Sequence, residues 1–170
     1  MKLSKLERVI LSNQYRILEK LDPEEVKYYE QNRKAIEEGY ALHYKGITER
    51  LYDELSEEAC QEVRDILNMY KALTFSFKKL EDKSEIDKDK IKFCGFDGND
   101  EVETKMMRYV EYYVNYLKKF KELRDDHEFP DYNSHEPMLD KYRRMLNIWK
   151  EHVDKNNLSK EDIIRIIKVD

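Results

Sequence analysis

The stretch SEEACQEVRDILNMYKALTFSFKKL, residues 56–80, decides the fold class of this chain. Ser56 offers the hydroxyl acceptor that caps a helix start, and acidic residues follow in the first turn. Apolar side chains then recur at alternating steps of three and four residues, the spacing of one helix face. We predict a single amphipathic helix of roughly 24 residues, long enough to cross a domain at 1.5 Å per residue. The apolar positions are Val63, Ile66, Tyr70, Leu73, Phe77 and Leu80.

A second apolar seam of the same period begins near residue 102. We predict one long helix over 102–123 that packs antiparallel against the first, or against a second subunit. Its apolar positions are Val102, Met106, Tyr109, Tyr113, Tyr116, Phe120 and Leu123.

The N-terminal third predicts a capped helix of its own. Ser4 and Glu7 have the spacing of a capping box, in which each side chain accepts a hydrogen bond from a free backbone N–H. The helix that follows runs to about Leu21. Its apolar residues are Leu6, Val9, Ile10, Ile17 and Leu21.

A proline restarts the helical pattern after this first helix. We predict Asp22 as the N-cap and Pro23 as the first residue of a second helix, which ends near Gly39. Residues 40–55 predict a further helix, broken near Gly46.

The C-terminal half adds shorter elements. FCGFDGND, residues 93–100, is the glycine-dense point of the chain and predicts a tight turn, with Asn99 or Asp100 capping the next helix. A helix is predicted around 137–152, and Ser159 begins a short isoleucine-rich one.

Together these patterns predict an all-α fold, a compact bundle of about six to seven helices with two long central helices. The 170 residues suit one domain. We therefore expect a single helical domain over 1–170, within which an N-terminal subdomain, 1–55, packs on 56–170. The four glycines and three prolines are too few for a β-sandwich or a proline-rich linker protein.

Charge and cysteine content bound the function. The net charge of −5 lacks the basic footprint of a general nucleic-acid binder. No apolar run has the length of a membrane span, and no signal-peptide pattern opens the chain. Cys60 and Cys94 lack zinc-site spacing. We expect a cytoplasmic protein with two reduced thiols and no membrane association.

The tyrosines of segment 102–123 are the first candidate site. Tyr109, Tyr113 and Tyr116 border one helix face near lysines, and aromatic rings interleaved with cations can stack single-stranded bases. Tyrosines at helical spacing also suit a core with a polar rim. Both interpretations stay open, with core packing favoured.

Arg143 and Arg144 are the second candidate, because adjacent guanidinium groups can clamp an anion. An internal or subunit ion pair with acids of another helix is favoured over such a ligand site. Asp97 is the third, since it begins an alternation with Asn99 and Glu101 that resembles part of a calcium loop. The positions that should hold glycine and glutamate in such a loop carry other residues, so a glycine turn is favoured over a cation site.

Catalytic motifs are missing from the sequence. The four histidines form no HxxxH pair, and no GxSxG, P-loop or GxGxxG occurs. We therefore predict no catalytic, cofactor-binding or metal-binding residue. An enzyme would need a dispersed site, for example Arg143 or Arg144 with Asp97 and a histidine. The histidines are His43, His127, His135 and His152.

Several segments, in this order and spacing, resemble the YfbU family of small bacterial proteins. The resemblance implies an all-helical cytoplasmic protein with no established activity or catalytic residues, loosely associated with bacterial stress or cell death. The segments are RVILSNQYRILEKLDP (Arg8–Pro23), AIEEGYALHY (Ala35–Tyr44), EEACQEVRDILNMYKAL (Glu57–Leu73), FCGFDGND (Phe93–Asp100) and PMLDKYRRMLNIW (Pro137–Trp149).

The leading hypothesis is a non-catalytic interaction or regulatory protein. We expect it to self-associate, as a dimer or higher oligomer, through an apolar or tyrosine-rich helix face. We also expect a protein partner that the sequence does not identify. The alternative is a nucleic-acid-binding regulator that uses a helix-turn-helix in residues 4–45 or the tyrosine and lysine face of 102–123. Residues 1–45 hold nine Lys/Arg and eight Asp/Glu, which is weak support for a groove-binding helix.

Overall fold

The computed structural model describes residues 2–49, 51–124, 131–152 and 154–169. Over these ranges the chain is all-α, as predicted, with eight α-helices and no strand beyond one isolated bridge. The chain divides into two compact units, unit 1 (Met1–Glu54) and unit 2 (Leu55–Asp170). The predicted packing of residues 1–55 on the remainder stays a prediction.

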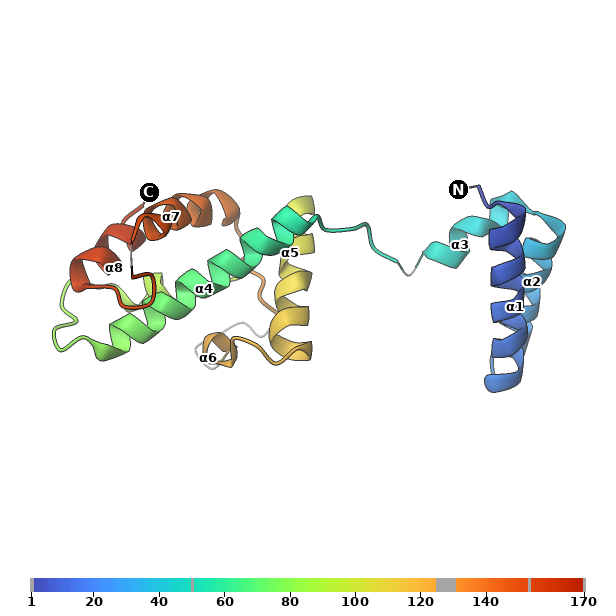
Figure 1. Ribbon diagram of the computed structural model, residues 1–170, viewed down its shortest axis with the longest axis horizontal. Helices are drawn as coiled ribbons and strands as arrows, with labels where there is room; N and C mark the ends of the chain where they lie inside the picture. The colour runs from blue at the N-terminus through green and yellow to red at the C-terminus, as the bar shows by residue number, and fades with distance from the viewer. Residues whose placement is uncertain (1, 50, 125–130, 153, 170) are drawn as a thin grey trace. The chain divides into compact units, whose positions relative to one another are not determined.

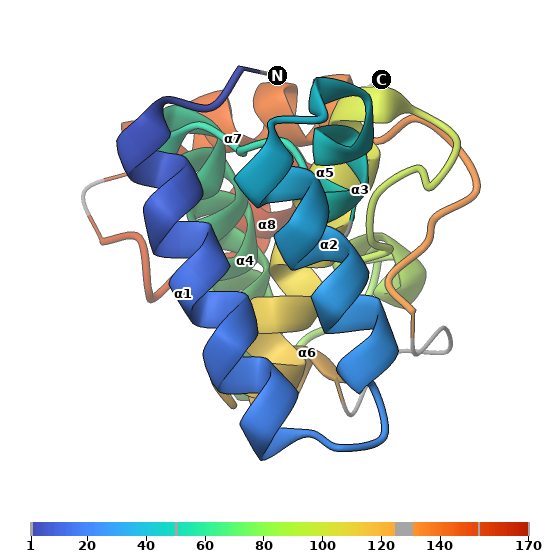
Figure 2. The same ribbon diagram turned by 90° about the vertical axis from the view of Figure 1, so that its right-hand side faces the viewer.

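Unit 1 is a helical hairpin. Helices α1 (Lys5–Leu21) and α2 (Val26–Glu38) lie side by side, and α3 (Tyr44–Thr48) follows a 3-10 turn (Figure 2). The predicted capping box is confirmed, because the Ser4 hydroxyl accepts from the Glu7 N–H and the Glu7 carboxylate accepts from the Ser4 N–H. Gly39 ends α2 in the left-handed conformation, at φ 80°.

The predicted start of α2 is wrong. The helix begins at Val26, and Asp22 does not cap it. The Asp22 carboxylate instead accepts a hydrogen bond from the Tyr29 hydroxyl at 2.9 Å, one turn into the helix. The predicted break at Gly46 is also wrong, since Gly46 lies inside α3.

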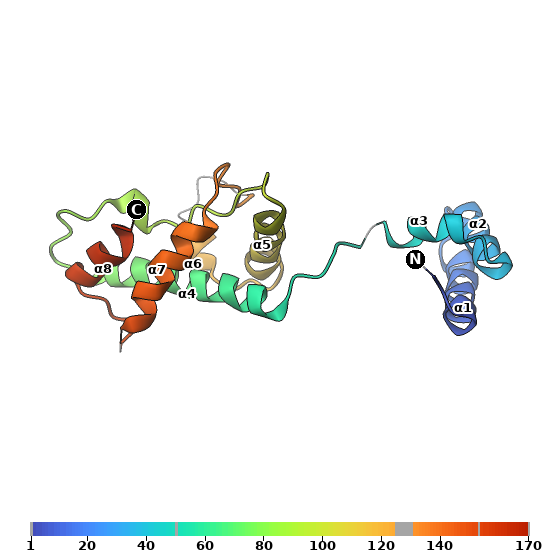
Figure 3. The ribbon, with the colours of Figure 1, turned by 90° about the horizontal axis from the view of Figure 1, so that it is seen from above.

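Helix α4 (Glu57–Lys79) is the centre of unit 2. Ser56 caps it by accepting from the Ala59 N–H, as the sequence predicts. Helix α5 (Glu101–Glu111) lies at its amino-terminal end, and α7 (Leu139–Glu151) and α8 (Lys160–Ile167) pack along it towards the other end (Figures 1 and 3). Every apolar position predicted between 63 and 73 is buried.

Four rings form the middle of the unit 2 core. Tyr70 of α4, Phe93, Phe96 and Tyr142 of α7 contact one another with ring centroids 5.5–5.8 Å apart, mostly edge to face. The Tyr142 hydroxyl donates to the Gly95 carbonyl at 2.8 Å, so its polar end is satisfied within the core. Burial raises the pKa of both the Tyr70 and the Tyr142 hydroxyl well above the ordinary value.

The single helix predicted over 102–123 is divided. Helix α5 ends at Glu111, a π-helical turn spans Tyr112–Tyr116, and α6 is the short segment Lys121–Arg124. Lys118 and Phe120 between them have positive φ, which no continuous helix allows.

The buried face of this segment also differs from the predicted seam. Met106 is buried as expected, but Val102 and Tyr116 are exposed. The residues of this segment that are buried in the core are Glu103, Met106, Val110 and Val114, together with Leu123, which is buried as predicted. The predicted seam placed Tyr109, Tyr113 and Tyr116 on the buried face. In the structure, the aliphatic residues Val110 and Val114 take the buried positions instead.

The loop FCGFDGND is tied to the segment around 132–134. Phe96 donates its N–H to the Tyr132 carbonyl at 2.9 Å, and Ser134 donates its N–H to the Phe96 carbonyl at 3.0 Å. Gly95, at φ 91°, permits this approach, since a Cβ there would lie 2.0 Å from the Tyr132 carbonyl oxygen. Asp100 caps α5 through the N–H groups of its first turn, which confirms one of the two predicted caps.

A buried carboxylate holds the start of α7. Glu103 of α5, 4% exposed, accepts hydrogen bonds from the backbone N–H groups of Met138 and Leu139 at 2.9–3.1 Å. It also accepts from the Asp97 N–H at 2.8 Å. One side chain therefore joins α5, the glycine loop and the amino end of α7, where a negative charge is favoured. At the far end of the unit, Ser159 and Asp162 form the predicted cap of α8.

Candidate functional site

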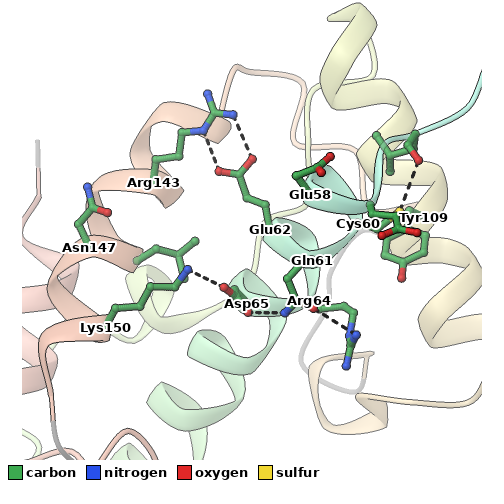
Figure 4. A pocket seen from close by; sticks show the side chains of 13 residues that line it. Glu58, Cys60, Gln61, Glu62, Arg64, Asp65, Tyr109, Arg143, Asn147 and Lys150 are labelled. Atoms are coloured by element: carbon green, nitrogen blue, oxygen red, sulfur yellow. Dashed lines mark hydrogen bonds and ion pairs between the residues drawn. The ribbon is translucent and has the colours of Figure 1, made fainter.

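An open groove of about 760 Å³ lies between α4, α7 and the side of α5 (Figure 4). It brings together two residues that the sequence singled out, Tyr109 and Arg143. Its principal polar lining is Glu58, Gln61, Glu62, Arg64, Asp65, Asn147 and Lys150.

The cations of α7 in this groove are paired with acids of α4. Arg143 donates to both carboxylate oxygens of Glu62, at 2.8 and 3.0 Å, and Lys150 lies 2.5 Å from Asp65. The hydrogen bonds to Glu62 raise the pKa of the Arg143 guanidinium. Burial acts to raise the pKa of Asp65, but the Lys150 ion pair and the hydrogen bond from Gln61 lower it overall. These contacts join α7 to α4, and the Arg143–Glu62 pair is the ion pair with an acid of another helix that the sequence favoured over an anion clamp.

The other end of the groove carries Cys60 and Tyr109. The Cys60 thiol donates weakly to the Leu55 carbonyl at 3.8 Å (Figure 4). Burial raises the pKa of the half-buried Tyr109, and neighbouring Cys60 adds to this effect. Among the described residues that line the groove, none is a histidine.

The tyrosines continue outward from Tyr109 along the π-helical turn. Tyr112 stacks on Tyr109 and Tyr116 stacks on Tyr112, with ring centroids 6.4 and 5.8 Å apart. Tyr112 is 47% exposed and Tyr116 is 79% exposed. We call Tyr109, Tyr112 and Tyr116 the tyrosine ladder. Tyr113 lies beside the ladder and outside its stack: its half-buried ring is tilted against that of Tyr109, with centroids 5.5 Å apart, and lies 5.8 Å from that of Phe120.

The remaining predicted site residues do not join this groove. Arg144 occupies the next position of α7, where its side chain is exposed. Asp97 is buried in the glycine loop, where its carboxylate accepts from the backbone and side-chain nitrogens of Asn99 at 2.9 and 3.1 Å. Asp97 and Arg143 therefore do not converge on one pocket, and His127 lies outside the described residues.

The outward face of α1 is a feature that the sequence analysis missed. Towards α2, this helix presents polar groups: Arg8 donates to the Ile36 and Glu37 carbonyls, and Ser12 donates to the Glu37 carboxylate. The side chains away from α2 are apolar and exposed, from 37% for Leu18 to 74% for Leu21. We define the α1 apolar face as Leu6, Val9, Ile10, Ile17, Leu18 and Leu21.

The contact between α1 and α2 is therefore mixed, since Tyr15 of α1 also packs with Ile36 of α2 in a small apolar core, while a second apolar stripe of α1 faces outward. The apolar period was visible in the sequence, but so was the polar period of Arg8, Ser12 and Glu19 on the opposite side. Because α2 is short and can cover only one side of α1, the presence of both an apolar and a polar stripe on α1 could have indicated that one of them is exposed.

The described residues contain neither a cluster suited to a metal ion nor a membrane-spanning helix. Across residues 2–49, 51–124, 131–152 and 154–169, no three His, Cys, Asp or Glu side chains gather as a metal site would require. Within that part of the chain, no helix combines the length and apolarity of a membrane span.

A comparison with protein-family models accounts for nearly the whole chain. The model described as the YfbU domain matches residues 1–169 of the 170. The match covers the hairpin of unit 1 as well as the groove, the glycine loop and the tyrosine ladder of unit 2. The chain therefore belongs to the YfbU family.

Proposed function

We propose that this protein is a non-catalytic interaction protein that self-associates through the α1 apolar face. The observation that carries the proposal is the exposure of six apolar side chains on one side of α1. A contiguous apolar surface of this kind is costly in water and is typical of an interaction site. The tyrosine ladder is a second surface, suited to a protein partner because tyrosine offers large contact area and a polar hydroxyl.

A second copy of the chain is the partner that we favour for the α1 face. The face is symmetric along the helix, since Leu6, Val9 and Ile10 lie as far from its midpoint as Leu21, Leu18 and Ile17. Two antiparallel copies related by a two-fold axis would therefore present apolar residues to each other over the whole length of α1. A regulatory role, with the link to stress or cell death that the family resemblance implies, and a cytoplasmic location belong to the same proposal. The free thiols Cys60 and Cys94 support a reducing compartment.

Sedimentation velocity over a micromolar concentration series tests self-association. We expect the wild-type chain to dimerise and the double variant Ile10→Glu/Ile17→Glu to weaken dimerisation by about 100-fold or more. The two-fold contact would bury four new carboxylates, and burying an unpaired charge is strongly unfavourable.

Gln31→Glu is the matched control, because it adds a negative charge at an exposed position of α2 and should leave the dimer unchanged. A wild-type chain that stays monomeric throughout the series would contradict self-association. An unaltered dimer in the double variant would contradict the α1 face alone. A monomeric wild type whose double variant unfolds would mean that another part of the same chain covers this face.

Nucleic-acid binding is the second candidate, and the exposed stack of Tyr112 and Tyr116 near Lys118 and Lys119 favours it. The side-by-side packing of α1 and α2 differs from a helix-turn-helix, whose helices cross at about 90–120°. Binding of a single-stranded oligonucleotide measured over a salt series, with wild type and Tyr112→Ala/Tyr116→Ala, separates this candidate from protein binding.

A further inference from the structure

A second pocket, of about 400 Å³, lies in unit 2 away from the groove of Figure 4. Residues of α4, of the loop that follows it and of α6 line this pocket. Its lining is Thr74, Phe77, Lys78, Lys83, Lys88, Ile91, Lys92, Phe93 and Leu123. We call it the lysine pocket.

The charge of the lysine pocket is unusual for this protein. Among the described residues that line it, four are lysines and none is acidic, although the whole chain carries a net charge of −5. Lys92 is paired with Asp89 at 2.9 Å. Lys78, Lys83 and Lys88 have no ion pair with any residue in the described ranges. The groove of Figure 4, by contrast, balances its lysine and arginines with acids.

The floor of the lysine pocket is apolar. Ile91, Phe93 and Leu123 are each at least 95% buried and belong to the main core. Phe77 is half-buried, and its ring is accessible enough for the Lys83 ammonium to lie 5.5 Å from its centroid. Asp87 caps the 3-10 turn Lys88–Ile91 by accepting the Asp89 N–H, and this turn carries Lys88 and precedes Lys92.

An apolar floor lined by four lysines selects one chemical class of ligand. A small inorganic anion would leave the floor unused, and a neutral apolar ligand would leave the lysines unpaired. The volume suits a compact molecule with a flat ring that stacks on Phe77 and several negative charges that reach the lysines. We propose that the lysine pocket binds a nucleoside di- or triphosphate, independently of the surface through which the protein self-associates.

Such a site would differ from the nucleotide sites that the sequence analysis considered. No glycine-rich phosphate loop lies in the pocket lining, so lysine side chains supply the charge that a P-loop draws partly from backbone N–H groups. The proposal is one of binding, with no hydrolysis implied.

Isothermal titration calorimetry of the full-length protein with ATP and GTP tests the proposal. Adenosine and inorganic triphosphate are titrated separately, because each carries only one of the two features that the pocket is proposed to recognise, the ring or the charge. We expect a nucleotide to bind at least tenfold more tightly than either half, with an affinity that falls as salt is added. The double variant Lys83→Glu/Lys88→Glu should weaken nucleotide binding at least tenfold. Phe77→Leu should weaken the binding of nucleotide and leave that of inorganic triphosphate unchanged.

Lys79→Glu/Lys90→Glu is the matched control. These lysines are exposed neighbours of the lining residues on the same helix and loop, but they lie outside the pocket. Their replacement should leave the dissociation constant within about twofold. The proposal is overturned if neither nucleotide binds at millimolar concentration, if inorganic triphosphate binds as tightly as the nucleotide, or if both double variants weaken binding equally.

Discussion

Replacing Glu103 with alanine is expected to lower the free energy of unfolding of unit 2 by about 4 kcal/mol. The carboxylate is 4% exposed and accepts hydrogen bonds from the backbone N–H groups of Asp97, Met138 and Leu139. Its removal leaves two donors without an acceptor at the amino end of α7 and a third in the glycine loop, and each buried unpaired donor costs about 1–3 kcal/mol.

Urea denaturation followed by the fluorescence of Trp149 measures this effect, because the only tryptophan of the chain lies in α7. Glu101→Ala is the control, since it removes an exposed glutamate from the first turn of the same helix and should cost about 0.5 kcal/mol or less. Glu103→Gln should fall between the two, because the amide keeps one acceptor oxygen. If Glu103→Ala matched the Glu101 control, the carboxylate would have no structural role.

Gly95→Ala is expected to destabilise unit 2 by about 3 kcal/mol or more. At φ 91° the alanine Cβ would lie 2.0 Å from the Tyr132 carbonyl oxygen, a backbone atom that cannot rotate away. That carbonyl accepts the Phe96 N–H, and the Gly95 carbonyl accepts the Tyr142 hydroxyl. A shift of the loop would therefore strain contacts on both sides of it.

The same denaturation experiment with Gly46→Ala provides the contrast. A Cβ at Gly46 meets nothing within 4 Å, and the residue lies inside α3. Alanine should therefore leave the unfolding midpoint of unit 2 unchanged and favour the helix in unit 1. A folded Gly95→Ala protein with a wild-type midpoint would show that the loop adjusts without cost.

The sequence predicted those parts of the fold that depend on neighbouring residues. Ser4, Ser56 and Ser159 each cap a helix as expected, because a cap involves atoms only three residues apart. Asp22 failed as a cap since a hydrogen bond to Tyr29, seven residues away, competes for its carboxylate.

The division of segment 102–123 could not be read from its periodicity. A π-helical turn adds residues to one turn and so rotates every later side chain out of the expected register. Tyr116, predicted within the seam, becomes an exposed member of the tyrosine ladder. Glu103 was equally hidden, because its three donors come from segments that only the folded chain brings together.

The candidate site was predicted in part. Tyr109 and Arg143 share one groove, but the partner of Arg143 is Glu62, 81 residues away, which no local pattern indicates. Asp97 and Arg144 lie elsewhere. The lysine pocket combines α4, the polar loop after it and α6, and nothing in the sequence of α4 or of the loop shows that their lysines line one pocket.

The ion pairs between α1 and α2 and the exposed α1 apolar face respond in opposite ways to added salt. Arg16, Arg33, Glu19 and Glu37 hold the two helices together through ion pairs, which added salt screens. The contacts of an apolar face are strengthened by excluded salts such as sulfate. A salt such as sulfate is therefore expected to weaken the ion pairs that join α1 to α2. The same salt should strengthen the association of the α1 apolar face with another apolar surface.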